Sequence, residues 1–194
     1  MLQSPLASLN PALRICTQLR EAWRAHSNRT AIINTNRDEN CERAIQAALK
    51  SVSLPSSAED PDFLRKRASQ LSVGQAQRVL IAMAILHRPA LLIADEATSA
   101  LDVITQSEIL ELFARLNREA GMSILYIAHD LPSVAGICKR IAILHEGKVV
   151  ECGPTEKIFN SPVHAYTRRL MSALPQLPIR HEAALAKAQA ATKD

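Results

Sequence analysis

Glycine, aromatic residues and long apolar runs are all scarce in this chain. It has five glycines among 194 residues, and only 3% of its residues are Phe, Trp or Tyr. A fold that needs several glycine-rich loops is therefore disfavoured, and the core must be mainly aliphatic. The longest apolar run, Val79–Leu86, is far shorter than the roughly 20 residues of a membrane-spanning helix. With 47% hydrophobic and 22% charged residues, the composition is that of a globular protein.

Cysteine pairs and a strong charge of one sign are also missing. The four cysteines form no Cys-x-x-Cys and have no histidine at ligand spacing, which indicates reduced, buried thiols rather than a metal site. Lys plus Arg exceeds Asp plus Glu by 23 − 19 = 4, with no basic run beyond Arg65–Arg67. This argues against a nucleic-acid binder. The first residues lack the pattern of a signal peptide, so we expect a cytoplasmic protein.

The first half of the chain has helical periodicity. One helix is expected from Asn10 to His26, with Asn10 as the N-cap and Pro11 in the first turn. A second is expected from Glu39 to Lys50, and a short basic helix from Phe63 to Ala68. Together these segments predict a small helical subdomain.

The second half alternates short apolar runs with a long helical pattern. A helix is expected from Val103 to Glu119, ended by Gly121 in a left-handed conformation. Strands are expected on either side of this helix and again later, at Leu91–Ala94, Ser123–Ala128, Arg140–Leu144 and Lys148–Cys152. Strand, helix and strand in this order predict a parallel sheet with a right-handed crossover. Because the strands are continuously apolar, we expect the sheet to be covered on both faces.

Two short helices are expected in the tail, from Gly153 to Phe159 and from Val163 to Ala173. After Pro175 the chain reads either as a solvated helix or as a frayed end.

The apolar run LLIADE ends in two acids, Asp95 and Glu96. At the carboxyl edge of an α/β sheet, where such proteins bind ligands, Asp95 would lie near a phosphate-bound metal ion. Glu96 could orient or deprotonate a water molecule. The alternative is a strand end with two solvated acids.

Two further segments have features of a phosphate site. Ser72 and Gly74 come directly before a helix, whose N-terminus favours an anion, although an ordinary N-cap is the better interpretation of this pair taken by itself. His129 ends the second strand beside Asp130, on the same expected edge as Glu96. A surface or packing role is the alternative for His129.

In their order and spacing these segments resemble the ATP-binding cassette (ABC) ATPases of membrane transporters. LSVGQ is similar to the signature motif, LLIADE to the Walker B strand, SALD to the D-loop, and His129 to the switch histidine. Gln3 resembles the Q-loop glutamine. The segment GKVVECGPTEKIFNSPVHAYTRRLMSALP resembles the C-terminal extension of oligopeptide, dipeptide and nickel importer ATPases.

The resemblance implies a role for each matched residue. Asp95 would hold Mg²⁺ through water, Glu96 would be the general base, and His129 would contact the γ-phosphate of ATP. Gln3 would touch the metal and the water. Residues of the signature motif and the D-loop would serve the ATP of a second ATPase subunit in a head-to-tail dimer, namely Ser72, Gly74, Gln75 and Asp102.

The resemblance also implies partners and a location. Transmembrane permease subunits would dock partly on the helical segment Asn10–Ala68, with the protein peripheral at the cytoplasmic face of the inner membrane and no nucleic acid involved. The implied fold is α/β: an incomplete P-loop NTPase (ABC ATPase) fold with a parallel sheet flanked by helices and a helical subdomain. The implied divisions are a Q-loop region, the helical subdomain with the signature helix, the C-terminal part of the nucleotide-binding core, and the tail, at 1–9, 10–90, 91–153 and 154–194.

One motif of that family is not found. None of the five glycines begins G-x-x-x-x-G-K-[ST], the P-loop whose backbone N–H groups surround the phosphates. Val73 also stands where the family usually has glycine. This chain alone is therefore expected to bind ATP weakly or not at all.

Three functions follow from these motifs. The first is the ATP-binding subunit, or a fragment of one, of an importer for peptides, nickel or related solutes. The second is a non-catalytic remnant or interaction module that docks a permease or a complete ATPase. The third, a soluble cassette protein in DNA repair or on ribosomes, is disfavoured by the importer-type tail and the weak charge.

Overall fold

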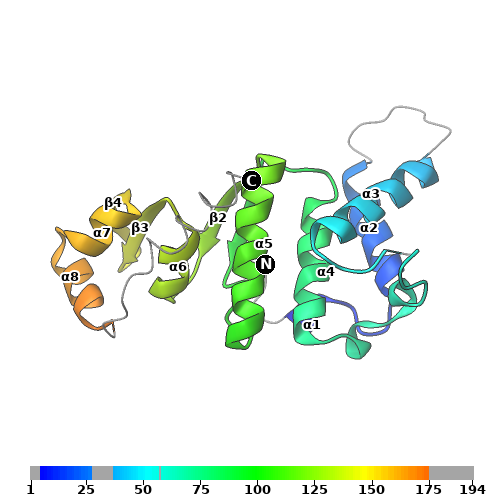
Figure 1. Cartoon of the computed structure of the whole chain (residues 1–194), viewed down its shortest axis with the longest axis horizontal. Coiled ribbons are helices and arrows are strands. Elements are labelled where there is room, and N and C mark those ends of the chain that lie inside the picture. The colour runs from blue at the N-terminus through cyan, green and yellow to red at the C-terminus, as the bar shows by residue number, and fades with distance from the viewer. Residues whose placement is uncertain (1–4, 28–36, 57, 175–194) are drawn as a thin grey trace, which may run out of the picture. The chain divides into compact units, whose positions relative to one another are not determined.

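The computed structural model describes residues 5–27, 37–56 and 58–174, which form two compact units. The first unit extends to His129 and the second begins at Asp130. Figure 1 shows the helices and strands of both.

The first unit is mainly helical, and most of its elements match the expected ones. Its helices are α1 (Pro5–Ser8), α2 (Ile15–Ser27), α3 (Arg37–Ser51), α4 (Val73–Ile85) and α5 (Val103–Ala120). Two 3₁₀ turns, Phe63–Arg65 and Ala68–Gln70, replace the expected short basic helix. The strands are β1 (Leu91–Asp95) and β2 (Ser123–Ile127).

The expected helix start at Asn10 is wrong by five residues, because Asn10 makes a turn instead of a cap. Its side-chain oxygen accepts the N–H of Ala12 at 2.9 Å. Arg14 then forms an isolated bridge with Arg67, and the N–H of Ile15 donates to Lys66 O at 2.9 Å. Asparagine often bonds to nearby backbone in this way, and here that bonding delays α2.

Glycine 121 ends α5 as expected. It has φ 63°, in the left-handed region. The helix that precedes it buries Ile109, Leu112, Phe113 and Leu116 on one face.

Strands β1 and β2 are parallel, in the register Leu91 with Ser123 through Asp95 with Ile127. One face of the pair is buried, since Leu92 and Ala94 belong to the core that also contains the buried face of α5. The expectation that both faces are covered is wrong for the described residues. On the second face four large side chains are about half exposed, namely Leu91, Ile93, Leu125 and Ile127. The described residues of the first unit therefore leave about half of the surface of each of these side chains exposed.

The second unit is a hairpin with three short helices. Strands β3 (Arg140–His145) and β4 (Lys148–Pro154) pair antiparallel, and Glu146 and Gly147 in the turn have φ 49° and 75°. The helices are α6 (Leu131–Ile137), α7 (Thr155–Asn160) and α8 (Ala165–Ser172). Sequence reasoning missed α6. The segment after Pro175 lies outside the described residues.

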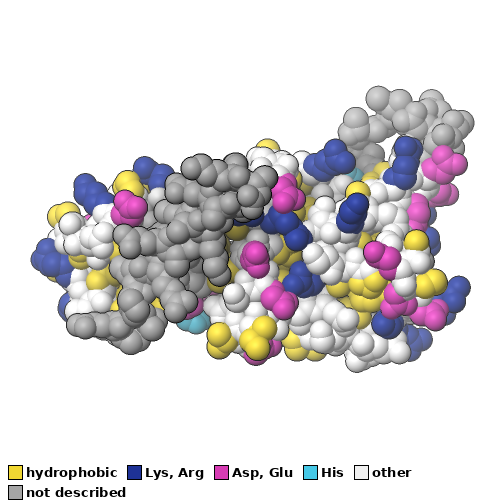
Figure 2. Space-filling view, viewed as in Figure 1, with side chains coloured by type: hydrophobic (Ala, Val, Ile, Leu, Met, Phe, Trp, Pro, Cys, Tyr) yellow, Lys and Arg dark blue, Asp and Glu magenta, His cyan; other side chains and the backbone are white. Residues whose placement is uncertain are grey.

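The described strands thus form two separate two-stranded sheets, β1–β2 and β3–β4. In the described ranges, none of the helices is both long enough and apolar enough to span a bilayer. Figure 2 shows Lys and Arg side chains interspersed with Asp and Glu on the face in view.

Candidate functional site

Glu96 and His129 lie at one edge of the β1–β2 sheet. Parallel strands end at the same edge, and these residues follow β1 by one position and β2 by two. His129 Nδ1 is 3.4 Å from Glu96 Oε1. The structure therefore brings together two side chains that are 33 positions apart and that sequence analysis placed on a common edge.

The backbone of Glu96 is held in an uncommon conformation. Its φ is 46°, in the left-handed region that favours glycine. The N–H of Glu96 donates to Ile127 O at 2.9 Å, and the Ser99 hydroxyl donates to Glu96 O at 3.0 Å. A non-glycine residue that keeps such a conformation is often part of a functional site, where surrounding bonds maintain the strain.

A hydrogen bond beneath this turn was not anticipated from the sequence. The Thr98 and Tyr126 hydroxyls are 2.8 Å apart, and Thr98 is buried. The centroid of the Tyr126 ring lies 6.1 Å from that of Phe113 in α5, so the tyrosine that makes this bond also packs against α5. The only signal was a tyrosine among the aliphatic residues of β2, and this signal does not indicate a partner.

Asp95 is the last residue of β1, and its side chain is exposed. Among the residues that the structure describes, no hydrogen bond or ion pair occupies its carboxylate. No described group of three or more His, Cys, Asp or Glu could hold a metal ion. At this edge the exposed Asp95 carboxylate could contribute an oxygen ligand to a metal ion.

Ser72 and Gln75 cap the first turn of α4 reciprocally. Ser72 Oγ accepts the N–H of Gln75 at 3.2 Å, and Gln75 Oε1 accepts the N–H of Ser72 at 3.1 Å. The cap interpretation of Ser72 is thus confirmed. Because both bonds use only acceptor oxygens of the side chains, the Ser72 O–H and the Gln75 NH₂ group still have donors for an anion.

Asp102 caps α5 in a similar manner. Its Oδ1 accepts the N–H groups of Ile104 and Thr105, and its Oδ2 accepts the Thr105 hydroxyl at 2.7 Å. These bonds, the Thr105 N–H first and its hydroxyl next, lower the pKa of Asp102 below its ordinary value. Asp102 is therefore a fixed anion at the start of α5.

The described residues thus form two clusters. One is Asp95, Glu96 and His129 at the sheet edge. The other consists of Ser72, Gly74 and Gln75 at the start of α4, with Asp102 at the start of α5. Within the described ranges no hydrogen bond or ion pair joins the two. Gln3 lies outside the described residues.

The chain belongs to the ABC transporter family. The model of that family matches residues 3–99, half of the chain. The model described as the oligopeptide/dipeptide transporter C-terminal region matches residues 150–193.

Curated relatives agree with this assignment. The glutathione import ATP-binding proteins GsiA of Escherichia coli K12 and of Shigella flexneri are each 42% identical to the chain over 175 residues. The match covers 90% of this chain and 26% of each relative, so the chain spans about a quarter of their length.

Solved structures share the fold. The cbiO1 protein of Clostridium perfringens, described as part of an ABC transporter complex, superposes with a TM-score of 0.67 at 25% identity. That match covers 89% of this chain and 62% of the other. A dimeric ATP-binding cassette bound to ADP and phosphate gives a TM-score of 0.56 at 28% identity, over 76% of this chain and 59% of the other. The expected fold class, that of ABC ATPase domains, is confirmed.

Proposed function

We propose that this chain is part of the ATP-binding subunit of an ABC importer, in which ATP binding and hydrolysis drive solute uptake. The Glu96–His129 pair at the sheet edge carries the proposal, because it places a carboxylate and an imidazole side by side where parallel strands end. Family membership supports it, as do the relatives that are themselves glutathione import ATP-binding proteins. The site is proposed to act on ATP with Mg²⁺.

Glu96 is proposed as the general base. Its strained backbone, tied to Ile127 and Ser99, fixes where the carboxylate begins, and its side chain is only 29% exposed. A carboxylate held in this way can accept a proton from an attacking water. His129, whose side chain is 72% exposed, would orient Glu96 through Nδ1 and leave Nε2 to face a phosphate oxygen. Mg²⁺, when bound, would neutralise phosphate charge near Asp95.

The second cluster is proposed to serve the nucleotide of a partner ATPase subunit. The remaining donors of Ser72 and Gln75, at a helix N-terminus with its positive dipole end, suit a γ-phosphate. Asp102, beside them, would act across the dimer. The solved cassette that resembles this chain is itself a dimer bound to ADP and phosphate. Gln3 is proposed to contact the metal and water.

The transported solute is proposed to be a peptide or a related small molecule. The match of residues 150–193 to the oligopeptide/dipeptide C-terminal model supports this, as does the glutathione importer relationship. The proposed location is the cytoplasmic face of the inner membrane, through contact with a permease. The proposed divisions remain residues 1–9, 10–90, 91–153 and 154–194.

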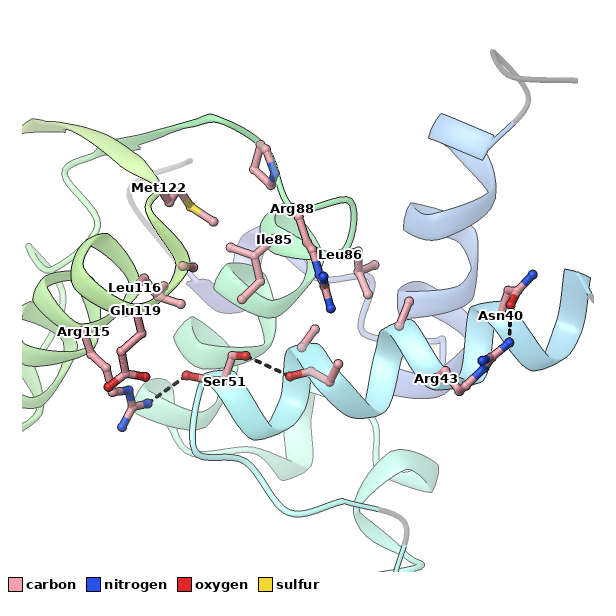
Figure 3. Close-up of a pocket in the computed structure, with 15 residues that line it drawn as sticks. Asn40, Arg43, Ser51, Ile85, Leu86, Arg88, Arg115, Leu116, Glu119 and Met122 are labelled. Atoms are coloured by element: carbon pink, nitrogen blue, oxygen red, sulfur yellow. Dashed lines mark hydrogen bonds between the residues drawn. The ribbon is translucent and has the colours of Figure 1, made fainter.

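A groove in the first unit is the proposed permease surface. Its volume is about 1030 Å³, and its walls come from α3, the end of α4 and the end of α5. Figure 3 shows Ile85, Leu86 and Arg88 across from α3. Arg43 and Arg115 also line it, with Glu119 as the acid, so the groove is partly apolar and has more basic than acidic side chains. Such a groove suits an amphipathic helix that carries acidic residues.

The catalytic part of the proposal is tested in a chimera. The P-loop-bearing segment of the E. coli relative is joined ahead of this chain, and ATP binding and hydrolysis are measured separately. Glu96→Gln should leave binding unchanged and lower turnover by about 100-fold or more. Glu111→Gln, an exposed glutamate of α5, is the matched control and should change neither.

Unchanged hydrolysis in Glu96→Gln would remove Glu96 from the base role. A chimera that folds and binds a permease but hydrolyses no ATP would instead support the interaction-module function.

The permease surface is tested by co-purification of the chimera with the relative's permease subunits. Arg43→Glu with Arg88→Glu should abolish capture. Arg118→Glu lies on α5 outside the groove lining and should have no effect. Equal capture of all three proteins would exclude the groove.

A further inference from the structure

The first turns of α4 and α5 touch at Gly74 and Thr105. A Cβ atom added to Gly74 would lie 2.7 Å from Thr105 Cγ2, closer than such atoms approach in proteins. A side chain at position 74 would therefore force Thr105 to shift.

Thr105 also holds Asp102. Its hydroxyl donates to Asp102 Oδ2 at 2.7 Å, and its N–H donates to Asp102 Oδ1 at 3.0 Å. One side chain thus has its methyl group against the turn that contains Gly74 and its hydroxyl on the carboxylate of Asp102.

The two arms of Thr105 cannot move independently. The methyl and the hydroxyl share Cβ, and a β-branched residue in a helix has few χ1 conformations. A rotation that moves the methyl away from Gly74 also takes the hydroxyl from Asp102. The helices are tied together one turn further along, where Arg78 Nη2 is 2.9 Å from Glu108 Oε2. Moving α4 and α5 apart would break that ion pair.

We propose that Thr105 is a positioning residue. When the first turn of α4 moves at Gly74, Thr105 moves with it and shifts the Asp102 carboxylate of the same chain. A role of this link in transport rests on the proposed function, in which Gly74 and Asp102 both face the nucleotide of a partner subunit. The link itself needs no nucleotide and is a property of this chain.

The test is an NMR titration of the Asp102 carboxyl carbon in the full chain. Gly74→Ala should raise the pKa of Asp102, because the added methyl displaces Thr105 and removes its hydroxyl bond. Thr105→Val, which keeps both branches but loses the hydroxyl, should raise it as well. Thr105→Ser keeps the hydroxyl and should leave the pKa of Asp102 near that of the parent chain.

The double variant Gly74→Ala with Thr105→Ser is decisive. Serine leaves room for the alanine methyl, so the pKa of Asp102 should return toward its parent position. The melting temperature, which should fall by several degrees in Gly74→Ala, should recover as well. Gly136→Ala, at a helical glycine with nothing within 4 Å of an added Cβ, is the control and should not move Asp102.

An unchanged pKa of Asp102 in folded Gly74→Ala would overturn the proposal, since the contact would then be packing alone. Failure of the double variant to restore the pKa would overturn it too. Neither result depends on hydrolysis in the chimera, so the link and the proposed function can fail separately.

Discussion

The two sheets of this protein obtain their burial in different ways. The β3–β4 hairpin pairs strands that follow one another, with a turn at Glu146 and Gly147 in left-handed conformations. It buries Ile141 and Ile143, with Ile158 of α7 also in the interior of this unit. The β1–β2 pair needs the whole of α5 between its strands, and only one of its faces is buried.

This difference shows that an apolar side chain in a strand is not necessarily buried by the described elements. Leu92 and Leu91 are adjacent and identical in type, yet they are 4% and 51% exposed. In the hairpin, burial alternates along β3 at Ile141 and Ile143, while Leu144 and Val149 beside the turn are 65% and 61% exposed. Apolarity on the second face of β1–β2 has no described partner.

The largest expected effect separates these two leucines. Leu92→Ala should destabilise the chain by about 2–5 kcal/mol, because it opens a cavity in the core. Leu91→Ala should change stability by no more than about 0.5 kcal/mol. Urea unfolding of both variants measures the difference. Equal losses would mean that the exposed face is covered in solution, and sedimentation would then show whether a second copy covers it.

A smaller effect is expected at the turn after β1. Glu96→Gly should stabilise the chain by about 0.5–1 kcal/mol, because glycine removes the strain of φ 46° but adds backbone entropy in the unfolded state. Glu96→Ala keeps Cβ and should show no such gain. Thermal unfolding compares the two. If alanine stabilises as much as glycine, the gain comes from the lost carboxylate and not from the backbone.

The smallest effect is expected in the hairpin unit, at Glu151. Its carboxylate accepts the N–H groups of Val163 and His164 at 2.9 and 3.0 Å, just before α8. The pKa of Glu151 is lowered to about 2, mainly by the bond from the Val163 N–H and next by the nearby hydroxyl of Thr167. That hydroxyl is buried but makes no bond of ordinary geometry, so the two backbone donors are the anchor.

A folded-state pKa below the ordinary 4.5 means that Glu151 adds stability above about pH 4.5, lost as the pH falls toward 2. Glu151→Gln should therefore speed amide exchange at Val163 and His164 at neutral pH and flatten the acid dependence of unfolding. Glu156→Gln, an exposed acid in α7, should leave both unchanged. Slow exchange in Glu151→Gln would show that other contacts hold α8.

Elements with local signals were predictable. The strands at Leu91 and Ser123 and the cap at Gly121 match the structure, because apolar runs and left-handed glycines depend on neighbouring residues. The start of α2 was missed because Asn10 bonds to the N–H of Ala12 and because Ile15 bonds to Lys66, 51 positions away, and the second bond has no local signal. For the site, the ends of two expected parallel strands predicted that Glu96 and His129 share an edge.

The sequence by itself determined the family, the order of the elements and which residues end the strands. Those properties follow from short-range pattern and motif spacing. Only the tertiary structure decided which atoms meet: His129 against Glu96, Tyr126 on Thr98, and Thr105 between Gly74 and Asp102. Such contacts depend on how helices pack on strands to within an ångström, and a one-dimensional pattern carries no such measure.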